Sequence, residues 1–144
     1  MRGPTRILVP MLLVTLLLPA LPAQAGDDPG PCALTLRDDE SVQHLSKRLI
    51  RCATDTWDVP GGADRSICIA DAESHLNPRA VSVDGWYLGL FQHEADAWPD
   101  RYDTWTRPAW GLDESALSGR TNAVVTIRMV HENGWGSWSG VGGC

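Results

Sequence analysis

The feature that most constrains this chain is a set of four cysteines that follows a segment with the features of a secretory signal. Met1–Ala25 carries arginines at positions 2 and 6, continues through an apolar stretch over residues 7–18 and ends in Ala23-Gln24-Ala25, which is the pattern of a cleaved signal peptide. The apolar stretch is shorter than the roughly 20 residues that span a bilayer. We therefore predict a signal peptide over residues 1–25 and a secreted protein, in preference to an uncleaved membrane anchor.

The cysteines all lie after this segment, at Cys32, Cys52, Cys68 and Cys144. An even number of cysteines in a small exported domain predicts disulfides, and the three possible pairings cannot be separated by sequence alone. We favour Cys52 with Cys68, which would join two helices, and Cys32 with Cys144, which would join the ends. The alternative is a zinc site, but no C-x-x-C pair and no histidine at matching spacing is present, so we predict no metal and no cofactor.

Length and charge indicate one acidic domain. The chain has 144 residues and a formal net charge of −6, and loss of residues 1–25 would remove two arginines and no acid. Such a charge argues against bulk electrostatic binding to nucleic acid or to an anionic membrane. Residues 26–37 are rich in Gly, Pro and Asp, which predicts a flexible mature N-terminus. We expect the folded domain over residues 38–144, as a monomer with no stable membrane insertion.

Apolar periodicity predicts helices on both sides of an irregular middle segment. The expected helices cover about residues 41–53, 63–73 and 118–132, the last ended by Gly134. Residues 113–117 are expected to add a short helix.

The middle segment contains a turn signal and many aromatic residues. Asp84-Gly85 predicts a tight turn, and residues 86–92 are expected to leave it as a short strand or an extended arm. Gly89 within this stretch indicates close approach of another backbone. Short helical turns and loop are expected over residues 95–110. The predicted fold is mainly α, a small helical domain with a short irregular or β segment, stapled by disulfides.

Glu73 is the leading candidate for a chemical role. It lies at the predicted end of the second helix, shortly before Asn77-Pro78, and a proline pushes the residue before it out of the α region. A carboxylate near the negative end of a helix dipole ionises less readily, which suits an acid that must hold its proton near neutral pH. The structural alternative is an ordinary solvated glutamate at a helix end.

Two sequence blocks around Glu73 resemble those of the soluble lytic transglycosylases and goose-type lysozymes, within the lysozyme-like superfamily. Residues 72–80 are similar to the family's E-S-x-x-N-P-x-A block, and Gly89-Leu90-Phe91-Gln92 stands where the family has G-L-M-Q. A third similarity is the late helix followed by Gly134-Trp135. The resemblance covers roughly residues 63–138. It implies an α+β lysozyme-like fold with a cleft flanked by the β segment, cleavage of the MurNAc–GlcNAc bond of peptidoglycan glycan strands, and Glu73 as the catalytic acid.

The resemblance leaves the fate of the cleaved sugar open. In the transglycosylases the same glutamate takes the proton of the sugar's C6 hydroxyl and a 1,6-anhydro product forms, whereas hydrolytic relatives use water. A hydrolase calls for a second carboxylate. Asp71 points to another helix face, and Asp84, Glu94 and Asp96 lie on loops without one standing out.

We therefore favour the single-acid transglycosylase route. The alternatives are a lysozyme-like hydrolase and a catalytically silent glycan-binding module. The silent module is motivated by the family's Tyr-Asn-Ala-Gly block, which is not evident in residues 129–134.

Four further residues are candidates for substrate binding. Ser74 and Gln92 suit hydrogen bonds to a sugar or to Glu73, with capping of the helix end and closing of a turn as the structural alternatives. Aromatic faces stack on sugar C–H faces, and the chain has seven tryptophans and two tyrosines. Because most of these are needed for the core, we choose Tyr87 and Trp135 for the cleft.

Overall fold

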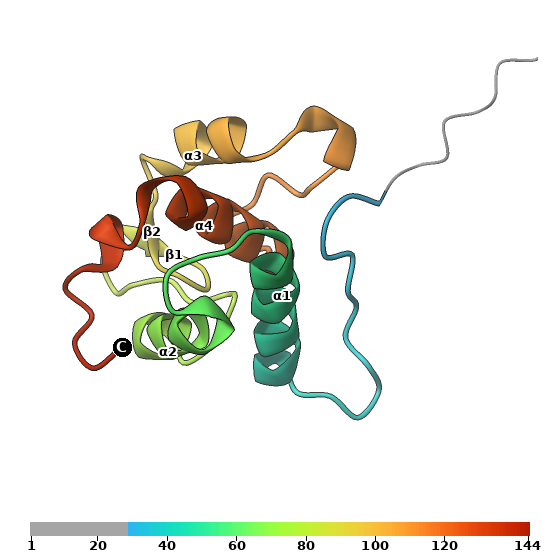
Figure 1. Ribbon diagram of the computed structural model, residues 1–144, viewed down its shortest axis with the longest axis horizontal. Helices are drawn as coiled ribbons and strands as arrows, with labels where there is room; N and C mark the ends of the chain where they lie inside the picture. The colour runs from blue at the N-terminus through green and yellow to red at the C-terminus, as the bar shows by residue number, and fades with distance from the viewer. Residues whose placement is uncertain (1–28) are drawn as a thin grey trace, which may run out of the picture.

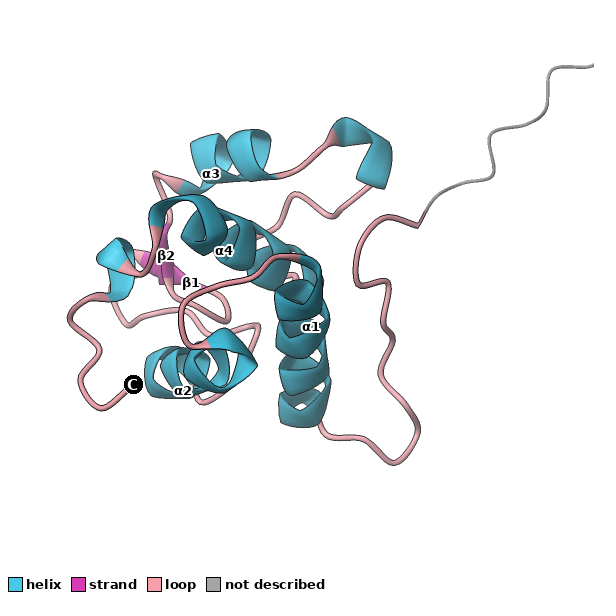
Figure 2. Ribbon diagram, in the orientation of Figure 1, coloured by secondary structure: helices cyan, strands magenta, loops and turns pink. Residues whose placement is uncertain are grey.

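The computed structural model describes residues 29–144, so the predicted signal peptide over residues 1–25 lies outside the described part. Over the described residues the chain is mainly helical with one small antiparallel sheet, which confirms the predicted mainly α fold class (Figures 1 and 2). The elements in chain order are α1 (Val42–Thr56), α2 (Gly62–Ser74), β1 (Tyr87–Leu88), β2 (His93–Glu94), α3 (Trp98–Trp105), the 3-10 turn η1 (Pro108–Trp110), α4 (Gly119–Asn133) and the 3-10 turn η2 (Gly136–Trp138). Within residues 29–144, no helix has the length and apolar character needed to cross a membrane.

The helix starts follow the local signals in the sequence. The Ser41 hydroxyl accepts the backbone N–H of His44 at the start of α1, and Ser118 does the same for Thr121 at the start of α4. These bonds satisfy amide groups that have no partner inside the helix. Gly134, with φ of 68°, ends α4 as predicted.

The end of α2 has a different cause from the one that the sequence suggests. The helix stops at Ser74, and both His75 and Leu76 have left-handed backbone, with φ of 52° and 59°. The turn is therefore complete before Pro78 is reached, so the proline is not what ends the helix. Two successive non-glycine residues in this region are unfavourable, and the buried Leu76 side chain holds the turn against the core.

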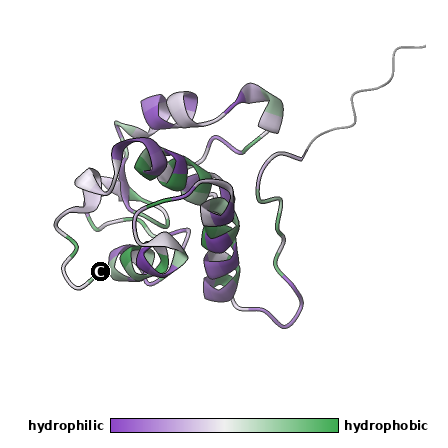
Figure 3. Ribbon diagram, in the orientation of Figure 1, coloured by the Kyte–Doolittle hydropathy of each residue, from purple (hydrophilic) through white to green (hydrophobic). Residues whose placement is uncertain are grey.

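Helix α4 is the centre of the packing. It contacts α1 and α3, while α2 packs on α1, and α4 crosses the middle of the molecule in Figure 1. Its residues from Thr121 to Ile127 are all buried. Helices α2 and α4 both carry apolar residues, drawn green in Figure 3, and Ile69 and Ala70 of α2 and Val124 of α4 are buried.

The disulfides join Cys32 to Cys52 and Cys68 to Cys144, so the favoured pairing of Cys52 with Cys68 and of Cys32 with Cys144 is wrong. Although α1 packs against α2, each helix cysteine is bonded to a terminal segment instead of to the other helix. The segment before α1 is bonded to α1, and the C-terminal tail returns to α2.

The N-terminal segment is attached to the domain at more than one point. Besides its disulfide, it accepts hydrogen bonds from the Arg120 guanidinium at the carbonyl oxygens of Pro29 and Pro31. Cys32 itself is buried. These bonds tie residues 29–37, the described part of the predicted flexible N-terminus, to α1 and α4, and the flexibility of this stretch stays a prediction.

Candidate functional site

Glu73 lies in the last turn of α2, one residue before the helix ends. Its side chain is partly buried, and this burial raises the pKa of the carboxyl above its ordinary value. Burial disfavours the charged form because the ion loses water. A carboxylic acid in this setting keeps its proton to higher pH than a free one, which is the property that a general acid needs.

Ser74 joins the end of α2 to the turn between β1 and β2. Its hydroxyl lies 2.8 Å from the carbonyl oxygen of Leu90 and 3.0 Å from that of Ala70, and the side chain is buried. The one hydroxyl proton of Ser74 is therefore used inside the protein, as in the structural alternative of capping the helix end, and substrate binding by Ser74 stays a prediction. The same contact brings together the two sequence blocks that were linked only by their spacing.

Asn122 on α4 holds this turn from the other side. Its side-chain oxygen accepts the N–H of Phe91 at 3.0 Å, and its amide nitrogen donates to Ala116 at 2.8 Å and to Leu88 at 3.4 Å. Asn122 is fully buried, and a buried amide is stable only when its groups are paired. Sequence reasoning missed this residue; a polar side chain within the apolar face of the last helix is the signal that could have found it.

Gly89 is required where the turn passes α4. Its φ is 78°, and a Cβ at this position would lie 2.2 Å from the carbonyl oxygen of Ala116 and 2.3 Å from the side-chain nitrogen of Asn122. The close backbone approach predicted from the sequence is thus confirmed. No larger residue fits without displacing the residues that position the turn.

Gln92 closes the same turn. Its amide nitrogen donates to the carbonyl oxygens of Gly89, at 2.9 Å, and Ala80, at 3.3 Å. The amide nitrogen of Gln92 therefore closes the turn, which is the structural alternative considered for this residue. The half-buried side chain also lines a hollow at the surface.

A buried polar network ties β2 to α3 and α4. Arg101 donates to Nδ1 of His93 at 3.0 Å, so the ring proton lies on Nε2, which contacts the Thr126 hydroxyl at 2.7 Å. That hydroxyl donates in turn to the carbonyl oxygen of Asn122 at 2.7 Å. Burial, with the nearby charge of Arg101 as a smaller cause, lowers the pKa of His93 to about 3. His93 is therefore a neutral structural residue at physiological pH.

The predicted site residues Tyr87 and Gln92 come together in one hollow, which we call the Tyr87 hollow. It has a volume of about 300 Å³ and is lined by Tyr87, Gln92, Glu94, Arg101, Ser137 and Trp138. Tyr87 pairs with Glu94 across the two strands. Glu73 does not line this hollow; its link to it runs through Ser74, which bonds to the turn that carries Gln92.

Trp135 lies in the core, so its placement on the cleft is wrong. The side chain is 6% exposed, its ring stacks on Phe91 at a centroid distance of 6.5 Å, and its indole nitrogen donates to Pro60 at 2.7 Å. The positive φ of Gly134 redirects the chain after α4, and the aromatic ring that follows packs inward. Its neighbour Trp138 lines the hollow instead and donates to the carbonyl oxygen of Phe91 at 2.9 Å.

Among the other acids considered as a second carboxylate, Asp84 has a structural role. Its carboxylate accepts hydrogen bonds from the Ser82 hydroxyl and the Trp86 N–H at the predicted turn. The bond from Ser82 is the main reason why the pKa of Asp84 is lowered. Glu94 is the acid that lines a hollow, and it is paired with Arg101 at 3.0 Å.

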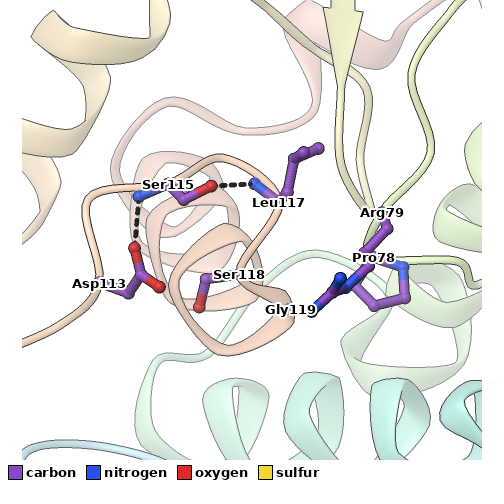
Figure 4. A pocket seen from close by; sticks show the side chains of 7 residues that line it. All are labelled: Pro78, Arg79, Asp113, Ser115, Leu117, Ser118 and Gly119. Atoms are coloured by element: carbon purple, nitrogen blue, oxygen red, sulfur yellow. Dashed lines mark hydrogen bonds between the residues drawn. The ribbon is translucent and has the colours of Figure 1, made fainter.

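A second hollow, of about 430 Å³, lies where α4 begins (Figure 4). Pro78 and Arg79 form one side, and the loop and the start of α4 provide the remaining lining through Asp113, Ser115, Leu117, Ser118 and Gly119. The short helix predicted over residues 113–117 is absent. The Asp113 carboxylate accepts the N–H of Ser115, whose hydroxyl accepts the N–H of Leu117, and such local bonds compete with helix formation.

Within residues 29–144, no three His, Cys, Asp or Glu side chains come together as a metal site. No family model matches the chain, and no curated protein or solved structure matches it either.

Proposed function

We propose that this protein is an exported peptidoglycan lytic transglycosylase that cleaves the MurNAc–GlcNAc bond, with Glu73 as its acid. The observation that carries the proposal is the setting of Glu73. Its pKa is raised by burial, and it lies one residue from the Ser74 bond that fixes the end of α2 to the Gly89–Gln92 turn. The resemblance of these two blocks to those of the transglycosylases supports the same assignment.

The proposed reaction needs one carboxyl group in two successive roles. Protonated Glu73 donates its proton to the glycosidic oxygen, and the bond between that oxygen and C1 of MurNAc breaks. The resulting carboxylate then accepts the proton of the C6 hydroxyl as O6 bonds to C1, which yields the 1,6-anhydro sugar. The proton that Glu73 gave is thereby restored.

The Glu73→Gln variant tests the proposed acid. Glutamine keeps the shape of the side chain but cannot transfer a proton, so we expect release of muropeptides from purified peptidoglycan to fall by at least about 100-fold. Asp71→Asn is the matched control, because it neutralises an exposed acid on another face of the same helix. Circular dichroism of both variants checks the fold. Undiminished release by Glu73→Gln contradicts the proposal.

Mass spectrometry of the released products separates the alternatives. Products with 1,6-anhydro ends indicate the transglycosylase, and reducing ends indicate a lysozyme-like hydrolase. Glycan binding without any cleavage by the wild-type protein indicates a silent binding module.

A further inference from the structure

We infer that the Tyr87 hollow is a saccharide-binding subsite in which Tyr87 offers a stacking face and Glu94, held by Arg101, accepts hydrogen bonds from sugar hydroxyls. The inference rests on the proposed function, because the glycan strand is the ligand that it names. It adds the residues that hold a sugar ring away from Glu73.

The first observation is the pairing of Tyr87 with Glu94. The two residues are directly opposite each other in the β1–β2 ladder, so their side chains lie on the same face of the sheet. Tyr87 is 43% exposed and the Glu94 side chain is 51% exposed. A sugar ring has an apolar C–H face and a rim of hydroxyl groups, and this pair presents an aromatic face beside a hydrogen-bond acceptor.

The second observation is the way in which Arg101 is held. It donates to the Glu94 carboxylate at 3.0 Å and to the buried His93 ring at 3.0 Å, and its own side chain is 19% exposed. A surface ion pair usually loses much of its value to side-chain motion. Here the second bond, to a neutral ring that is itself bonded to Thr126, fixes the guanidinium and hence the carboxylate, and such preorganisation favours binding.

The third observation is the hydrogen-bonding capacity that faces the hollow. Only one Glu94 oxygen, Oε2, bonds to Arg101, which leaves Oε1 as an acceptor. Gln92 uses its amide nitrogen within the turn, and Ser137 adds a hydroxyl to the lining. The volume of about 300 Å³ is at the small end for a ligand pocket, which suits one sugar ring of a longer strand.

The test measures binding of an N-acetylglucosamine tetrasaccharide by isothermal titration calorimetry, with every variant built on Glu73→Gln so that the probe is not cleaved. We expect Tyr87→Ala to weaken binding by about 3- to 10-fold through loss of the stacking face. We expect Glu94→Gln to weaken it by about 10-fold, because the acceptor loses its charge. Val83→Ala is the control: this exposed residue lies near Tyr87 in the chain but does not line the hollow, and binding should be unchanged.

Thermal unfolding separates recognition from a structural role. A Glu94–Arg101 pair that serves only the fold predicts a lower Tm for Glu94→Gln with unchanged affinity, and that result overturns the subsite. Absence of saturable binding by the parent protein overturns it as well.

Cleavage assays on the wild-type background keep this failure distinct from failure of the proposed function. If Glu73→Gln abolishes cleavage while Tyr87→Ala and Glu94→Gln leave the affinity for the tetrasaccharide unchanged, the subsite is wrong and the proposed function stands. If no protein cleaves peptidoglycan but affinity depends on both residues, the function is wrong and the subsite stands.

Discussion

At the residue scale, the burial of Glu73 has a thermodynamic consequence that is independent of any substrate. Below the unfolded pKa, about 4.3 for glutamate, a carboxyl whose pKa is raised in the folded state is protonated in both states. Its contribution to stability is fully present only in this pH range. As pH rises through the folded pKa, ionisation of the partly buried group removes that contribution. The protein should therefore be less stable at neutral pH than it would be with a neutral side chain at this position.

This reasoning predicts that Glu73→Gln stabilises the protein at pH 7. The difference in free energy of unfolding between the variant and the wild type should grow as pH rises from about 4.3 through the raised pKa and then stay constant. Because the side chain is only partly buried, the gain should be less than about 1 kcal/mol. Urea unfolding across this pH range measures it, with the exposed Glu114→Gln as the control for loss of a surface charge. A difference that is flat with pH would show that burial does not perturb Glu73.

At the element scale, the turn between β1 and β2 is held by side chains from three helical elements. Ser74 of α2 bonds to Leu90, Asn122 of α4 bonds on both sides of the turn, and Trp138 of η2 bonds to Phe91. The sequence indicated, through Gly89, that another backbone would lie close to this segment, but not which helices would hold it.

A pair of glycine substitutions tests how tightly this turn is held. Gly89 and Gly85 have nearly equal positive φ, 78° and 77°, but only at Gly89 would a Cβ meet other atoms. We expect Gly85→Ala to lower the free energy of unfolding by about 1–2 kcal/mol through backbone strain alone. Gly89→Ala adds the steric conflict and should lower it by about 2–5 kcal/mol. Urea denaturation compares the two variants, and equal losses would contradict the close approach of α4.

At the scale of the whole molecule, each of the two disulfides attaches one terminal segment to a helix. The Cys32–Cys52 bond spans 20 residues and attaches the N-terminal segment to α1, while Cys68–Cys144 spans 76 residues and closes the C-terminal tail onto α2. The tail includes η2, whose Trp138 packs against Phe91. The longer loop therefore connects the helix that carries Glu73 with one wall of the Tyr87 hollow.

Loop entropy predicts which bond contributes more to stability. Removal by paired serine substitution should lower the free energy of unfolding by about 3 kcal/mol for Cys32–Cys52 and about 4.5 kcal/mol for Cys68–Cys144, because the second closes the longer loop of the unfolded chain. Chemical denaturation of the two double variants measures the difference. A greater loss from the shorter loop would show that native contacts of the N-terminal segment, such as those of Arg120, outweigh chain entropy.

The sequence by itself determined the features that depend on neighbours along the chain. Helix caps at Ser41 and Ser118, the glycine that ends α4, the Asp84-Gly85 turn and the mainly α class all follow from short-range hydrogen bonding and periodicity. Only the tertiary structure decided which cysteines pair, that Trp135 packs inside while Tyr87 stays exposed, and that Asn122 and Trp138 hold the turn beside Ser74. Each of these depends on which faces of distant elements meet, and a one-dimensional pattern of residues does not specify the orientation of one element against another.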